Sequence, residues 1–124
     1  MTQATLFIQY ESPNPANPIA AVIAQIAKGC GAVIRDKLID DTDIETDLAF
    51  VNSAETALRF IKETEHTVIF LSYFNKNEET ESHALASRFP TRIKAMPIVE
   101  RTGEENILIP LILAIAEINK EKNQ

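Results

Sequence analysis

Polar side chains that could bind or act on a small molecule follow the apolar, strand-forming runs of this sequence. In an open α/β sheet, ligands bind in the crevice beyond the carboxyl ends of the strands. The side chains expected at that crevice are Glu11, Ser12, Ser72, Tyr73, Asn75, Arg101 and Thr102. Arg101 is the cation of this set, and its guanidinium would bind a carboxylate or a phosphate. The set predicts either a site for an anionic small molecule or ordinary hydrated loop ends.

The motifs that usually carry phosphate or nucleophilic chemistry do not occur in this sequence. It contains neither a GxGxxG pattern nor a Walker loop, and Gly29-Cys30-Gly31 follows a predicted helix rather than a strand. Cys30 has no base close in sequence that would make it a thiolate. His66 and His83 are most simply surface residues. We therefore predict no catalytic residue, no metal ligand and no cofactor.

A run of acidic side chains leads into the start of the second predicted strand and could attract a cation. Its members are Asp36, Asp40, Asp41, Asp43, Glu45 and Asp47. A calcium loop also needs a glycine at its turn and a glutamate at its end, and this run has neither. We therefore expect a solvated acidic loop.

Composition narrows the partners that the chain could bind. Its 124 residues include 18 acidic and 12 basic side chains, for a formal charge of −6, and this field repels nucleic acid and anionic membranes. One cysteine and an N-terminus without the basic region of a signal peptide predict a cytoplasmic protein. With 45% hydrophobic residues and few glycines, residues 1–124 are expected to form a single domain.

Apolar runs of strand-forming residues alternate with segments of helical periodicity. The predicted strands are Ala4–Tyr10, Thr46–Val51, Thr67–Tyr73 and Ile93–Val99. The predicted helices are Pro18–Lys28, a helix from the N-cap Asn52 through Ile61, a helix opened by a charged loop at Lys76–Glu81 and ending near Phe89, and Leu111–Lys120. This alternation predicts an α/β fold with three layers and a doubly wound, mainly parallel sheet of four or five strands. Thr67–Tyr73, the strongest strand signal, is predicted to be central.

Two segments allow more than one structure. Ala32–Ile39 combines helical spacing of its apolar residues with β-branched content, and we favour a helix. Asn106–Pro110 is either a short edge strand or the first turn of the last helix. Around Asn52, the glutamate at position 55 predicts a capping box.

The order of these elements resembles the receiver domain of bacterial two-component response regulators, which has a flavodoxin-like fold. The segments that carry the resemblance are LFIQYE (Leu6–Glu11), LAFVNSAETAL (Leu48–Leu58), TVIFLSYFN (Thr67–Asn75), and MPIVERT (Met96–Thr102) with NILIP after it. They would correspond to the first strand, the second strand and its helix, the phosphoacceptor strand, and the fourth and fifth strands. The wing domain that precedes some basic amino-acid decarboxylases is similar to a comparable degree.

The residues that receiver domains use for phosphorylation do not carry over. The resemblance places the phosphoacceptor aspartate at Ser72, one acid of the acidic pair at Tyr10, and the late lysine at Ile109, while Glu11 and Thr102 match. Aspartyl phosphorylation needs a carboxylate nucleophile and further carboxylates that hold Mg²⁺. The resemblance therefore implies a pseudo-receiver that keeps the signalling scaffold without the phosphorylation switch.

The last predicted helix is apolar on nearly every side, whereas a surface helix normally shows a polar stripe. It is either buried between layers or in contact with another subunit, and we favour a homodimer. The candidate interface residues are Leu108, Leu111, Ile112, Ile115 and Ile118. The expected function is a non-catalytic protein-interaction or regulatory module. The alternative is a small enzyme or binding protein for an anionic ligand.

Overall fold

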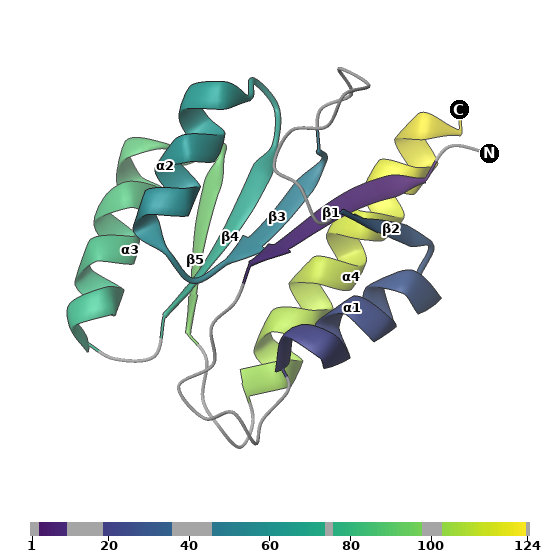
Figure 1. Cartoon of the computed structure of the whole chain (residues 1–124), viewed down its shortest axis with the longest axis horizontal. Coiled ribbons are helices and arrows are strands. Elements are labelled where there is room, and N and C mark those ends of the chain that lie inside the picture. Colours follow the sequence, from purple (N-terminus) through teal and green to yellow (C-terminus); the bar gives the residue numbers. More distant parts are fainter. Residues whose placement is uncertain (1–2, 10–18, 36–45, 74–75, 98–102, 124) are drawn as a thin grey trace.

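Five strands and four helices lie along the part of the chain that the structure describes, and within that part they alternate except that the third strand follows the second (Figure 1). The structure is a computed structural model, and it describes residues 3–9, 19–35, 46–73, 76–97 and 103–123. The strands are β1 (Ala4–Gln9), β2 (Ala32–Arg35), β3 (Leu48–Val51), β4 (Val68–Tyr73) and β5 (Ile93–Pro97). The helices are α1 (Ile19–Gly29), α2 (Ala54–Glu63), α3 (Lys76–Arg88) and α4 (Gly103–Lys122).

The strands form one parallel sheet in the order β2-β1-β3-β4-β5. Helices α1 and α4 lie on one face of the sheet, and α2 and α3 lie on the other (Figure 1). This is the strand order of flavodoxin-like folds, in which the chain first winds outward from β1 and then reverses to β3. The predicted three-layer, doubly wound α/β fold is confirmed.

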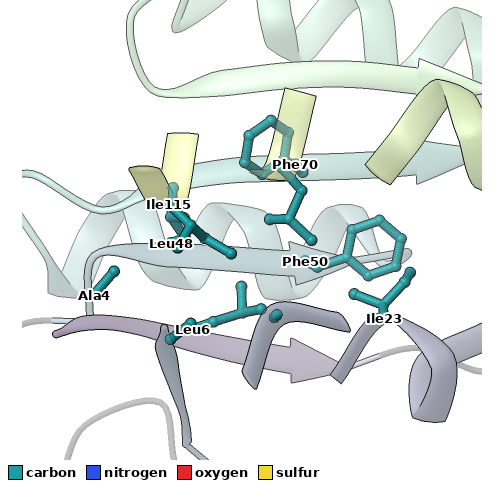
Figure 2. Close-up of a cluster of buried hydrophobic side chains, with 10 residues drawn as sticks. Ala4, Leu6, Ile23, Leu48, Phe50, Phe70 and Ile115 are labelled. Carbon is teal, nitrogen blue, oxygen red and sulfur yellow. The ribbon is translucent and has the colours of Figure 1, made fainter. Parts of the chain in front are cut away.

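Both faces of the sheet are apolar because successive side chains of a strand point to opposite faces. Toward α1 and α4, the side chains of Leu6, Phe50 and Phe70 pack with Ile23 and Ile115 (Figure 2). Toward α2 and α3, a second cluster forms around Phe7, Phe60, Ile69 and Leu71. Burial on both faces explains why β3 and β4 have continuous apolar sequences rather than alternating ones.

The structure corrects the prediction of a helix at Ala32–Ile39. Residues Ala32–Arg35 form the edge strand β2, which pairs in parallel with β1. The side chains of Ala32 and Ile34 pack into the core on the α1 face. Pairing with β1 therefore outweighs the weak local helical pattern, and residues 36–39 lie outside the described part.

Because β2 adds a strand beyond β1, the middle of the sheet is β3. The prediction that Thr67–Tyr73 is a parallel strand covered on both faces is confirmed, because β4 is a buried interior strand between β3 and β5. The resemblance placed the middle strand there, and that placement is wrong. The segment NILIP, which the resemblance placed as a fifth strand, lies inside α4, and the fifth strand is Ile93–Pro97. The first strand is where the resemblance placed it, and each of the next three strands that the resemblance identified stands one place further along the chain order.

Smaller corrections concern where helices begin. Ser53, not Asn52, is the N-cap of α2, and its hydroxyl accepts a hydrogen bond from the Thr56 amide at 3.4 Å. Helix α3 begins at Lys76, so the charged segment predicted to be a loop is its first turn and a half. Helix α4 begins at Gly103 rather than at the predicted Leu111, and it continues through Pro110. A proline inside a helix removes one backbone hydrogen bond, and the helix tolerates that loss here.

The C-terminal half of α4 is fastened to the start of the sheet through Asn119. Its Oδ1 accepts a hydrogen bond from the Ala4 amide at 2.7 Å, and its Nδ2 donates to the Gly31 carbonyl at 3.2 Å. One amide side chain thus joins β1, the turn before β2 and the end of α4, which are far apart in sequence. Gly31 has a φ of 92°, and a Cβ added there would lie 3.1 Å from Asn119 Nδ2.

Gly31→Ala is therefore expected to lower the free energy of unfolding by about 1–3 kcal/mol, because L residues are strained at this φ and the new methyl presses on Asn119. Gly29→Ala is the matched control, since a Cβ at Gly29 meets nothing within 4 Å. We expect that variant to be unchanged or slightly stabilised. Urea unfolding of both variants makes the comparison. Equal effects at the two glycines would contradict the role given to Gly31.

Candidate functional site

Two of the seven predicted crevice residues lie in the described part of the chain, at the carboxyl end of β4. These are Ser72 and Tyr73. The other five, which are Glu11, Ser12, Asn75, Arg101 and Thr102, lie outside the described residues. The predicted ligand site as a whole therefore stays a prediction.

Ser72 has a structural role in the sheet. Its side chain is buried, with 2% of the residue exposed, and its hydroxyl donates a hydrogen bond to the Val51 carbonyl of β3 at 3.1 Å. A buried hydroxyl that is already hydrogen-bonded is a poor nucleophile unless a base lies beside it. Ser72 and Tyr73 are neighbours in a strand, so their side chains point to opposite faces of the sheet. The structure does not bring these two side chains into one site.

Tyr73 contacts His83 of α3 at the carboxyl edge of the sheet. The Tyr73 hydroxyl lies 3.2 Å from His83 Nε2, and the ring centroids are 5.5 Å apart. Glu79, one turn earlier on α3, has its Oε1 4.0 Å from the same His83 nitrogen. The Tyr73 residue is largely buried, whereas the His83 and Glu79 side chains are about half exposed. His83 was predicted to be a surface residue, and its side chain is indeed half exposed. It also has a polar partner in Tyr73, which the sequence did not indicate.

Burial raises the pKa of the Tyr73 phenol above its ordinary value of 10.0, and the negative charge of Glu79 raises it further. The phenol is therefore neutral at physiological pH. It can donate a hydrogen bond to His83 or accept one from it, depending on the tautomer of the ring. A neutral phenol beside an imidazole can orient a ligand, but it offers no nucleophile.

We expect Tyr73 to ionise at a higher pH in the folded chain than in the unfolded chain. The unfolded phenol ionises first, so its contribution to stability is complete below about pH 10 and is lost as the pH rises through the folded pKa. The chain has two tyrosines, so a Tyr10→Phe variant isolates the ultraviolet titration of Tyr73. The same variant in urea is the reference, and Glu79→Gln should reverse part of the shift. Identical folded and unfolded titrations would contradict this expectation.

The middle strand ends without an acid. Strand β3 ends at Val51, and the next residue is Asn52. Across the described residues, the five strands end in Gln9, Arg35, Val51, Tyr73 and Pro97. None of these side chains is a carboxylate that could accept a phosphoryl group.

At the opposite edge of the sheet, where the strands begin, a network of polar contacts is centred on Asp47. Its Oδ2 accepts hydrogen bonds from the Thr5 amide at 2.8 Å, the Thr5 hydroxyl at 3.1 Å and Lys122 Nζ at 2.7 Å. Lys122 also donates to the Gln3 carbonyl at 3.2 Å. Asp47 was predicted to belong to a solvated acidic loop, and for this residue the prediction is wrong. Residues 36–45 lie outside the described part.

A cavity of about 270 Å³ lies beside this network. It is lined by Thr46, Asp47, His66, Val68, Ile118, Glu121 and Lys122. The Thr46 hydroxyl is buried and has no hydrogen-bond partner, but its oxygen presents almost no surface to a ligand. Among the described residues, no group of three or more His, Cys, Asp or Glu side chains could hold a metal ion. What the structure shows at this edge is that Asp47 and Lys122 connect β1 to the end of α4.

Helix α4 separates the predicted interface residues into different environments. Leu111 and Ile115 belong to the core, with 1% and 0% exposed, so the prediction that they meet another subunit is wrong. Ile112 and Ile118 are half-buried, and the side chain of Leu108 lies outside the described part. A helix on a sheet must bury one stripe, and Leu111 and Ile115 are one turn apart on that stripe.

Two other apolar residues of α4 face solvent instead. Ile109 is 61% exposed and Leu113 is 63% exposed, the highest values among the large hydrophobic side chains that the structure describes. A signal for them was present in the sequence. Glu117 and Lys120 mark the solvent side of the helix, and counting back by four residues from Glu117 leads to Leu113 and then to Ile109.

Within the described ranges, none of the helices combines the length and the apolar composition that crossing a bilayer requires. The same apolar α4 that could suggest a membrane segment packs one side against the sheet.

Comparisons with protein-family models, with curated proteins and with solved structures find no match to this chain.

Proposed function

We propose that this protein is a non-catalytic interaction module that binds a second copy of itself through the exposed side of α4. This surface, called the α4 face below, consists of Ile109, Leu113, Ala116, Glu117 and Lys120. All five residues are exposed. The observation that carries the proposal is the exposure of Ile109 and Leu113 on successive turns of one helix.

A single exposed leucine is ordinary, but neighbouring exposed apolar side chains on one helix form a patch. The half-buried Pro110 and Ile112 lie between Ile109 and Leu113 and extend the apolar surface toward the core. A helix that has a fully buried stripe at Leu111 and Ile115 does not need a second apolar stripe for folding. If a partner covers the second stripe, its apolar residues are buried in the complex, and this would explain why they are apolar.

The size of the patch sets the strength of association to expect. Burying a whole isoleucine or leucine side chain stabilises a complex by about 1.5–3 kcal/mol. Ile109 and Leu113 are still exposed over roughly 60% of their surface, so a partner that covers them would gain about that share of the free energy. Four such side chains in a symmetric dimer supply about 4–7 kcal/mol, which is comparable to the cost of association. Because little net free energy remains, we expect a weak dimer that forms only at about millimolar concentration.

The residues at the carboxyl ends of β3 and β4 support a role without phosphoryl transfer. The flavodoxin-like strand order is the scaffold of receiver domains, as the resemblance implied, and we propose that the chain uses it as a regulatory or signalling scaffold. Ser72 is occupied in a hydrogen bond to β3, and Asn52 follows the middle strand. An amide at that place lacks the nucleophilic oxygen that an aspartate would supply.

Sedimentation velocity over a range of protein concentrations tests the proposal. We expect the weight-average mass of the wild type to rise with concentration toward that of a dimer. Ile109→Glu and Leu113→Glu should each shift the association to at least about tenfold higher concentration, because each variant places two carboxylates in an apolar contact.

Leu58→Glu is the matched control for these variants. Leu58 is also an exposed leucine, at 40%, but it lies on α2 on the other side of the sheet. Its substitution should leave association unchanged. A wild type that stays monomeric up to millimolar concentration would reject the proposal, as would an equal effect of Leu58→Glu.

A further inference from the structure

We propose that the cavity at the amino edge of the sheet, where the strands begin, binds a small organic cation that has an ammonium group on a short apolar chain. The cavity lies between the starts of β3 and β4 and the last turn of α4. It uses none of the residues of the α4 face, so this proposal does not depend on the proposed function.

The size of the cavity limits the ligand to a small molecule. Pockets that bury drug-sized ligands usually have volumes of about 300–1,000 Å³, and this cavity has about 270 Å³. Its walls come from three stretches of the chain that are far apart in sequence. A ligand that fills it would therefore contact β3, β4 and α4 at once.

One part of the wall is apolar. Val68 and Ile118 line the cavity, and both side chains are half-buried and packed against the core cluster on the α1 and α4 side. Thr46 also lines the cavity, but its hydroxyl oxygen is buried and presents almost no surface. The ligand therefore needs an apolar part that the two aliphatic side chains can cover.

The charged part of the wall has one negative charge in excess. Asp47 and Glu121 contribute carboxylates, Lys122 contributes an ammonium group, and His66 is counted as neutral at pH 7. The charge of Lys122 is already matched, because its Nζ lies 2.7 Å from Asp47 Oδ2 and donates to the Gln3 carbonyl at 3.2 Å. Glu121, which is exposed, is the carboxylate that a cationic ligand would balance.

The Asp47 carboxylate can accept a further hydrogen bond. All the hydrogen bonds that its side chain accepts from the described residues go to Oδ2. The other oxygen, Oδ1, also has acceptor sites, and an ammonium group has three N–H donors. Lys122 shows that this edge holds an ammonium group between a carboxylate and a backbone carbonyl.

The end of α4 gives a second electrostatic reason for a cation. This helix ends at Lys122, beside the start of β1 (Figure 1), and its last turn lines the cavity. The last carbonyl groups of a helix carry a partial negative charge, which favours cations and disfavours anions. The formal charge of −6 on the chain acts in the same direction. The excess carboxylate, the helix end and the net charge thus all favour a cation.

Proton NMR of the whole chain during titration with n-butylammonium chloride tests the proposal, because the two histidines of the chain lie at opposite edges of the sheet. His66 lines the cavity, whereas His83 lies beside Tyr73 at the carboxyl edge. At constant pH and ionic strength, we expect a saturable shift of the His66 ring signals and no shift of the His83 signals.

Two other salts separate the two parts of the ligand. Sodium butyrate has a similar chain and the opposite charge, and it should give no saturable shift at His66. Ammonium chloride has the charge without the chain, and it should bind at least about tenfold more weakly than n-butylammonium, because it covers neither Val68 nor Ile118.

A matched pair of variants tests the role of the local charge. Glu121→Gln should weaken the binding of n-butylammonium by about two- to fivefold, which is the effect of one exposed charge. Glu81→Gln removes the same charge from an exposed position on α3, across the sheet, and it should leave binding unchanged.

The opposite results would overturn the proposal. Equal shifts at His66 and His83 would show that the amine associates with surface carboxylates without a site. A saturable shift with butyrate in place of n-butylammonium would show that the cavity prefers anions. Absence of any saturable shift would reject the site itself, and equal effects of Glu121→Gln and Glu81→Gln would reject the role given to Glu121.

Discussion

Ile115→Ala is expected to lower the free energy of unfolding by about 2–5 kcal/mol, whereas Leu113→Ala should change it by no more than about 0.5 kcal/mol. The two positions are two residues apart on the same helix. Ile115 is fully buried against the sheet beside Leu48 and Phe70 (Figure 2), and Leu113 is 63% exposed. Truncating Ile115 removes buried methyl groups and leaves a cavity, while truncating Leu113 removes surface already in water.

Urea unfolding at a protein concentration where the chain is monomeric checks this pair. The low concentration matters because dimerisation would itself add to the stability of the wild type. Leu111→Ala, at the other buried position of the stripe, should behave like Ile115→Ala. Equal losses at positions 113 and 115 would show that α4 has a different rotation on the sheet, and the proposed α4 face would then be wrong.

Asp47→Ala is expected to lower the free energy of unfolding by about 2–4 kcal/mol. The substitution leaves the Thr5 amide without its acceptor and leaves Lys122 without its counter-charge. The effect falls short of that of a fully buried ion pair because the Asp47 and Lys122 side chains are 22% and 24% exposed. A loss of this size is a large fraction of the stability of an ordinary small protein.

Two variants divide the expected loss between its causes. Asp47→Asn keeps one oxygen that can accept from Thr5 but weakens the attraction for Lys122, so it should cost less than Asp47→Ala. Lys122→Met removes the charge while the Thr5 hydrogen bonds remain, and it should cost about 0.5–1.5 kcal/mol. Chemical denaturation measures all three. An Asp47→Ala variant as stable as the wild type would show that this network does not fasten the amino edge of the sheet.

The sequence predicted the fold class because each strong element carries its own local signal. The run Thr67–Tyr73 is apolar and β-branched enough to identify a buried strand, and Lys28-Gly29 marks the end of the first helix. The weak elements were misassigned. The strand Ala32–Arg35 is short and only partly buried, so its local pattern is ambiguous, and pairing with β1 makes it a strand.

Contacts between distant residues explain the remaining errors. Asp47 lies 42 residues from Thr5 and 75 from Lys122, so nothing local distinguishes it from the acidic residues before it. The rotation of α4 is also a tertiary property. Its sequence is apolar on nearly every side, and only docking on the sheet separates the buried Leu111 and Ile115 from the exposed Ile109 and Leu113.

By itself, the sequence determined that this chain alternates strands and helices around a parallel sheet, because hydrophobic periodicity acts over a few neighbouring residues. The tertiary structure alone decided which strand is in the middle, which acid is a structural anchor and which side of α4 faces solvent. Those properties depend on which surfaces meet across the fold, and free energy gained between residues far apart in sequence leaves no local pattern.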